Sequence, residues 1–114
     1  MKFLLTILLT LPIVSEPIVS EAAIASWYGN QFHGRKTASG KVFNQWGLTC
    51  ASNTHKLGTK LLVTNPVNNK SVTVTVTDTG GFSKYGRTLD LSRGAFMRIA
   101  DLKQGTTKVQ IKVL

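Results

Sequence analysis

Two stretches of the chain alternate between apolar and polar residues. They are SVTVTVTD, residues 71–78, and KVQIKVL, residues 108–114. Alternation with a period of two is typical of a β-strand that buries one face. The apolar positions are expected to point inward, and they are Val72, Val74, Val76, Val109, Ile111 and Val113.

Three shorter segments predict further strands: 24–28, 60–65 and 87–91. A fourth, 41–43, is expected to be a strand or a turn. The asparagines within 67–70 predict a hairpin turn. One helix is expected to begin at a Ser92 cap and to end at residue 101 or 102. Six short strands, Gly-rich loops and one short helix predict an all-β protein that folds as a small β-barrel.

The first 22 residues have the pattern of an export signal. A short basic start is followed by an apolar run at 3–14 that is too short to span a bilayer. Small residues precede a cleavage site after Ala22, with Ala23 as the alternative. A retained anchor is the competing interpretation. Cleavage would leave one domain, 23–114, that is periplasmic or secreted and has no stable membrane anchor.

Charge and cysteine content narrow the class of protein. The expected mature chain of 92 residues carries 13 basic and 3 acidic residues, a net charge of +10. Outside the cytoplasm, such a charge favours anionic or polysaccharide cell-wall partners over nucleic acid. Cys50 is the only cysteine, so no internal disulfide can form, and it is expected to be a core residue.

Asp78 ends the first alternating stretch and precedes two glycines. By the period of two it falls on the valine side, where a carboxylate is costly to bury without a reason. One interpretation is an Asx turn before the glycines. The other is a functional acid, because partial burial favours the protonated form of a carboxyl group.

Four separated motifs occur in order and with compatible spacing: ASWYG (25–29), FHGRKTASG (32–40), LGTKLLVTN (57–65) and GRTLDLS (86–92). They resemble the rare lipoprotein A family of septal-ring lytic transglycosylases. This resemblance covers residues 25–114 and implies a six-stranded double-psi β-barrel, a fold shared with expansin and barwin domains. DTGG at 78–81 is also similar to the catalytic segment of membrane-bound lytic transglycosylase A.

The resemblance implies endolytic cleavage of the β-1,4 bond between MurNAc and GlcNAc, with formation of 1,6-anhydro-MurNAc. The C6 hydroxyl of the muramic acid closes on C1, so one carboxyl group can act first as acid and then as base. An ordinary glycoside hydrolase needs two carboxylates, and the expected mature chain has only Asp78, Asp90 and Asp101.

The resemblance places the catalytic acid of the family on Asp78. The Arg and Pro of the family's Asp-Arg-Gly-Pro-Phe segment are replaced by Thr79 and Gly81. The family's His falls on Ser52, and His55 is a candidate substitute for it. The alternative function is therefore a non-catalytic, expansin-like module that binds polysaccharide or loosens the wall. An aspartic protease is disfavoured, because only 36 residues follow Asp78.

Several residues are candidates for supporting or substrate-binding roles. Asp90 lies between two leucines and should point away from the core, where it could support Asp78 or bind backbone amides near Ser92. Four aromatic residues could stack on sugar rings or pack in the core: Trp27, Tyr28, Phe32 and Phe82. His33 and Arg35 could bind glycan hydroxyls or wall-peptide carboxylates, or brace their loop. We expect a monomer that binds peptidoglycan glycan strands, with no cofactor and no metal.

Overall fold

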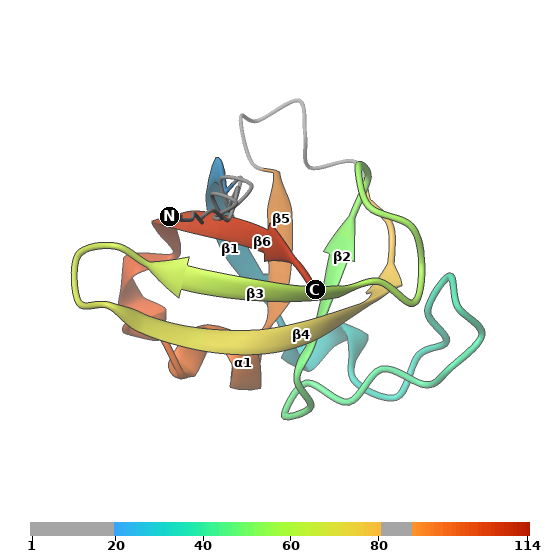
Figure 1. Cartoon of the computed structure of the whole chain (residues 1–114). Coiled ribbons are helices and arrows are strands. Elements are labelled where there is room, and N and C mark those ends of the chain that lie inside the picture. Colours follow the sequence, from blue (N-terminus) through green and yellow to red (C-terminus); the bar gives the residue numbers. More distant parts are fainter. Residues whose placement is uncertain (1–19, 81–87) are drawn as a thin grey trace, which may run out of the picture.

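The computed structural model describes residues 20–80 and 88–114. These residues form six strands, one α-helix and two 3-10 helices (Figure 1). In chain order the elements are β1 Glu21–Tyr28, η1 Asn30–Phe32, β2 Thr49–Ser52, β3 Lys60–Asn65, β4 Lys70–Asp78, β5 Leu89–Ser92, α1 Arg93–Met97, η3 Leu102–Gln104 and β6 Thr106–Val113.

The strands close into a mixed barrel in the order β1-β5-β2-β4-β3-β6. The pairs β1–β5 and β2–β4 are parallel, and the other four pairs are antiparallel. Helix α1 follows β5 directly and packs against it and β1. The expected all-β barrel with one short helix is confirmed.

The inward residues of the alternating strands build the barrel core. Five of the six expected inward residues are buried: Val72, Val74, Val76, Val109 and Ile111. The prediction was wrong for Val113, which is 53% exposed. Val113 is the last residue of β6, at the rim of the barrel, where no following strand residue covers it.

The segment 41–43, expected as a strand or a turn, is not one of the barrel strands, and one barrel strand was not predicted. Residues 41–43 form only an isolated bridge between Lys36 and Val42. The true second strand is β2, which lies between β4 and β5. It has four residues, TCAS, and three of them are buried. A short central strand with this composition shows no alternation by which its sequence could be recognised.

Helix α1 begins where expected but ends early. The Ser92 hydroxyl accepts a hydrogen bond from the Ala95 N–H at 3.2 Å, which confirms the predicted cap. The helix ends at Met97, and the Ile99 carbonyl instead accepts the side-chain amide of Asn65 at 2.8 Å. A tertiary contact therefore replaces the continuation of the helix.

Asp101 has a structural role that the sequence did not indicate. Its carboxylate accepts the Lys103 N–H at 3.0 Å, and it forms a capping box with Gln104 at the start of η3. Asp101 is exposed to solvent and at the same time caps η3.

The barrel begins two residues before the expected domain start. Glu21 pairs with Ile111 and Ala22 pairs with Gln110, so both belong to β1. The signal segment lies almost wholly within residues 1–19, outside the described part of the chain, and its cleavage stays a prediction. In the described residues, no helix has the length and apolar character needed to cross a membrane.

Candidate functional site

A β-bulge decides which face of the barrel carries Asp78. Cys50 lies opposite Val76, whereas Ala51 lies opposite Asp78, so Thr77 is an extra residue on β4. One extra residue reverses the alternation of the side chains that follow it. Asp78 therefore does not continue the valine row, and the expectation that it does is corrected.

Strand register brings the two aspartates onto one face. Ala51 lies opposite both Asp78 and Asp90, and Ser26 lies opposite Asp90. Residues directly opposite one another project to the same side of a sheet. We call these four residues, Ser26, Asp90, Ala51 and Asp78, the acidic row. The prediction that Asp90 points away from the core is confirmed, because the leucines on either side of it are fully buried.

Hydrogen bonds hold both carboxylates. The Ser26 hydroxyl donates to Asp90 Oδ1 at 2.8 Å. Asp78 is half-buried, and its Oδ1 accepts the N–H groups of Ala38 at 3.0 Å and Thr79 at 2.9 Å. Within the described residues, Asp78 Oδ2 has no hydrogen-bond partner. Asp78 therefore closes its own turn, as the Asx interpretation required, and still presents one oxygen to a ligand.

Asn53 fixes the backbone that follows Asp78, a role that the sequence analysis did not identify. Its Oδ1 accepts the Gly80 N–H at 3.0 Å, and its Nδ2 donates to the Gly80 carbonyl. This pair of bonds ties the β2–β3 loop to the end of β4. An asparagine in a polar loop has no feature in the sequence that would distinguish it from an ordinary turn residue.

Tyr28 lies beside the acidic row. Its ring stacks on Phe43 with centroids 4.5 Å apart and meets Phe32 edge-on at 5.8 Å. Its hydroxyl is buried and has no hydrogen-bond partner in the described structure. Burial raises the pKa of Tyr28, and the negative charges of Asp78 and Asp90 raise it further, with Cys50 a lesser cause. The phenol is therefore a neutral hydrogen-bond donor close to both carboxylates.

A surface depression of about 420 Å³ adjoins this face. Its wall comes from the end of β1, from η1 and from β5–α1, and includes Tyr28, Phe32, Asp90 and Arg93. Apolar rings beside a few polar groups are typical of a site for a small or extended ligand. Within residues 20–80 and 88–114, no three His, Cys, Asp or Glu side chains gather to hold a metal ion.

The candidate aromatic residues have different positions. Trp27 lies opposite Leu91 and donates its indole N–H to the Leu102 carbonyl at 3.1 Å. It is partly buried against the core and also lines the depression. Phe32 is 39% exposed and lines the depression, where a sugar ring could reach it. Phe82 lies outside the described residues.

The two polar candidates in the 29–48 loop differ in their contacts. His33 Nδ1 accepts the Gln45 N–H at 3.1 Å, so this side chain braces the loop, one of its two expected roles. Arg35 is exposed, and its backbone pairs with Phe32 and Phe43. Its side chain makes no hydrogen bond or ion pair in the described structure.

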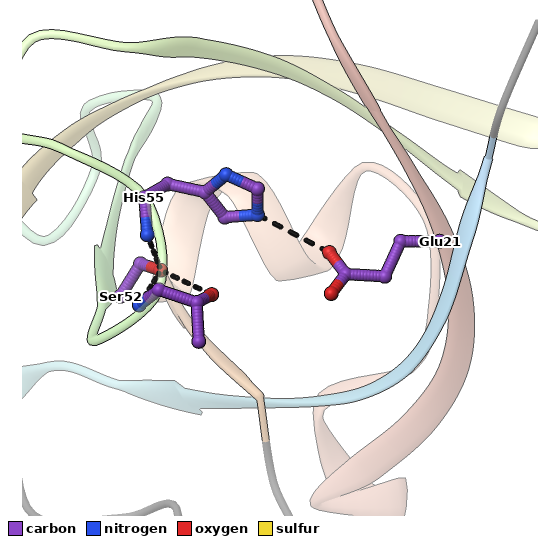
Figure 2. A network of polar contacts seen from close by, with 4 residues as sticks. Glu21, Ser52 and His55 are labelled. Atoms are coloured by element: carbon purple, nitrogen blue, oxygen red, sulfur yellow. Dashed lines mark hydrogen bonds and ion pairs between the residues drawn. The ribbon is translucent and has the colours of Figure 1, made fainter.

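Ser52 and His55 form a separate network (Figure 2). Ser52 is fully buried, and its hydroxyl accepts the N–H groups of Thr54 at 3.2 Å and His55 at 3.1 Å. The His55 imidazole points to Glu21, with Nε2 3.2 Å from the carboxylate oxygen. Neither side chain forms a hydrogen bond or an ion pair with Asp78, so the polar contacts give no support for a direct role of either beside the acid.

Cys50 is a core residue, as expected. It is fully buried, and burial followed by the charge of Asp90 raises the pKa of its thiol to about 12. Because the thiolate is the reactive form, folded protein at pH 8 is expected to resist iodoacetamide. Mass spectrometry should find alkylation only after denaturation. Rapid modification of folded protein would contradict this placement.

Trp46 is a surface residue that the sequence analysis did not select. It is 53% exposed, and the Arg93 guanidinium lies over its ring, 4.7 Å from the centroid. The available signal was a tryptophan in the polar loop segment NQWG, where no alternation assigns it to a core.

Comparison with known protein families shows to which family the chain belongs. A family model described as "Lytic transglycolase" matches residues 20–111. The chain belongs to the lytic transglycolase family. The earlier resemblance to rare lipoprotein A proteins is therefore confirmed at the level of the family.

Two related proteins show how this lytic transglycolase domain compares with its relatives in sequence and length. It is 47% identical over 91 residues to the endolytic peptidoglycan transglycosylase RlpA of Campylobacter jejuni, covering 80% of this chain and 33% of the relative. The chain thus spans about a third of that enzyme. It is also 44% identical over 90 residues to an uncharacterized protein of Synechocystis, covering 79% of this chain and 94% of that protein.

The fold of the domain is also found in expansins. An expansin mutant of Clavibacter michiganensis, solved with cellohexaose, superposes with a TM-score of 0.66 at 20% identity, covering 84% of this chain and 50% of that one. At this identity the likeness shows the fold alone. The expected double-psi β-barrel is confirmed.

Proposed function

We propose that this domain is an endolytic lytic transglycosylase of peptidoglycan. It would cleave the β-1,4 bond between MurNAc and GlcNAc and leave a 1,6-anhydro-MurNAc end. The observation that carries the proposal is the half-buried Asp78 carboxyl group, held through Oδ1 with Oδ2 available. Membership of the lytic transglycolase family and 47% identity to a named endolytic transglycosylase support it.

One carboxyl group suffices for the proposed reaction. Protonated Asp78 gives its proton to the glycosidic oxygen as the bond from C1 breaks. The resulting carboxylate then takes the proton of the C6 hydroxyl as that oxygen bonds to C1. No water attacks, so the second carboxylate of an ordinary glycoside hydrolase is not needed.

The neighbours of Asp78 suit this reaction. The two backbone N–H groups on Oδ1 fix the orientation of the carboxyl group, so that Oδ2 faces the substrate. The ring of Tyr28 lines the depression beside Asp90, and its buried, neutral hydroxyl adds no further charge next to the acid. Asp90, held by Ser26, contributes negative charge that favours a cationic transition state.

The alternative is a non-catalytic, expansin-like module. The observation that favours it is Ser52, which stands at the position of the family's His and is buried in the turn network of Figure 2. A module of this kind would bind the glycan in the depression lined by Tyr28, Phe32, Asp90 and Arg93 without cutting it.

Product analysis separates the two functions. Purified, peptide-stripped glycan strands are incubated with the domain, and the products are identified by mass spectrometry. Shortened strands with 1,6-anhydro ends are expected. Intact strands that remain bound to the protein would refute the enzyme and favour the binding module.

Glycan-strand binding is expected to depend on salt. The charge of +10 on residues 23–114 attracts an anionic polymer. Raising the salt concentration well above physiological strength shortens the screening length below about 8 Å and should weaken binding. Co-sedimentation with wall glycan at increasing salt measures this effect. Binding that is unchanged by salt would leave stacking and hydrogen bonds as its cause.

We also propose that the domain acts outside the cytoplasm as a monomer, after removal of residues 1–22. The short apolar run at 3–14 supports export. The N-terminal sequence of the exported protein is the direct test, and a chain that still begins at Met1 would contradict the proposal.

A further inference from the structure

Trp46 combines an exposed side chain with a firmly held backbone. Its side chain is 53% exposed. Its N–H donates to Asn44 Oδ1 at 3.0 Å, and the Gln45 carbonyl accepts the Gly94 N–H at 2.8 Å, which ties this loop to α1. A single exposed apolar side chain is common on protein surfaces. One whose backbone is fixed in place is also preorganised for binding.

Arg93 connects Trp46 to the depression beside the acidic row. Its guanidinium lies 4.7 Å from the centroid of the Trp46 ring and 5.9 Å from that of Trp27. It also lines the depression that contains Tyr28 and Asp90. Its Nε atom is buried and has no hydrogen-bond partner in the described structure. A buried donor without a partner costs free energy, so Arg93 is held in this place by its contacts with the two tryptophan rings and by the bond from its Nη1 to Gln45 Oε1 at 3.5 Å.

We propose that Trp46 and Arg93 form a second sugar-binding platform. This rests on the proposed function and deepens it: the platform holds a sugar unit at a distance from the bond that Asp78 cuts. One face of the Trp46 ring is covered by Arg93, and the exposed remainder can stack on the apolar face of a pyranose ring. The Arg93 N–H groups can donate to its hydroxyl or acetamido oxygens.

The surroundings favour a sugar over a purely apolar ligand. The exposed ring of Trp46 is followed, across Arg93, by the Tyr28 ring and by Asp90, which both line the depression. A pyranose has apolar faces and a rim of hydroxyl groups, so it matches both kinds of surface. A strand of such units would lie along the depression toward the acidic row.

Binding of an uncharged oligosaccharide tests the platform without requiring turnover. The probe is a β-1,4-linked N-acetylglucosamine hexamer, and calorimetry measures its affinity. Trp46→Ala is expected to weaken binding about tenfold, because stacking is lost. Arg93→Lys keeps the charge but removes the planar guanidinium group that covers Trp46, and it should also weaken binding. Val67→Ala, which alters an exposed residue of the β3–β4 turn, is the control and should bind as wild type does.

An NMR signal from Trp46 in the wild-type protein reports sugar binding without relying on a variant that could misfold. The chain has two tryptophans, so its NMR spectrum has two indole N–H signals, and the one missing in Trp46→Ala is assigned to Trp46. The hexamer should shift that signal in the wild-type protein. An unshifted Trp46 signal at saturation, or wild-type affinity in Trp46→Ala, would overturn the platform.

The platform and the proposed function can fail separately. With glycan strands as substrate, Trp46→Ala should raise KM several-fold and leave kcat nearly unchanged. If wild-type protein gives no anhydro product but the hexamer still shifts Trp46, the platform stands and the enzyme is refuted. If the product forms and Trp46→Ala has the wild-type KM and affinity, the enzyme stands and the platform is refuted.

Discussion

Asp78→Asn is expected to abolish the 1,6-anhydro product while the barrel stays folded and still binds glycan. An amide can neither give the proton to the leaving oxygen nor take one from the C6 hydroxyl. Its oxygen can still accept the Ala38 and Thr79 N–H groups, so the turn after β4 stays closed. Activity should fall by at least about a hundredfold, as for the loss of a general acid or base.

Three measurements on this variant decide between the roles of Asp78. They are mass spectrometry of the glycan products, circular dichroism of the fold, and affinity for glycan. Asp78→Ala is the matched comparison, because it removes the two backbone hydrogen bonds as well. Asp90→Asn should reduce activity less, since Asp90 supports the site. Normal product formation by Asp78→Asn would refute the mechanism, and unfolding would make Asp78 a structural residue only.

Gly94→Ala is expected to destabilise the protein and to displace the Trp46 loop. A Cβ atom at Gly94 would lie 2.5 Å from the Trp46 carbonyl oxygen and 2.8 Å from its carbon. Both are backbone atoms, so the loop or the start of α1 must move. Forcing such a shift in a packed region typically costs about 1–3 kcal/mol in the free energy of unfolding. This is a large share of the total of about 5–15 kcal/mol for a small domain.

Urea unfolding followed by circular dichroism measures this loss. Gly47→Ala is the control, because its Cβ would come no closer than 3.3 Å to the Asn44 carbonyl oxygen. A smaller loss is expected there. An unchanged unfolding midpoint for Gly94→Ala would show that the 44–47 loop adjusts freely, and it would remove the argument that Trp46 is firmly held.

Prediction from sequence succeeded where the pattern was long and local. The alternation in 71–78 and 108–114 identified β4 and β6 and most of their buried residues. The Ser92 cap marked the start of α1, because capping depends on neighbours within one turn. The four separated motifs identified the family, and with it the barrel.

Prediction failed where distant residues decide the outcome. The four residues of β2 become a strand because β4 and β5 lie on either side of them. Helix α1 ends early because Asn65, from β3, binds the Ile99 carbonyl. Neither contact produces a periodic pattern in the sequence, because the residues that make it come from distant segments of the chain.

The sequence by itself determined the alternating strands, the family, the net charge and the small number of carboxylates. Only the tertiary structure decided how those carboxylates are presented. The bulge at Thr77 turns Asp78 away from the valine row, and the register of β2 and β5 then places it on one face with Asp90. A bulge depends on how two strands pair, and pairing between segments so far apart in the chain is set by packing of the whole barrel.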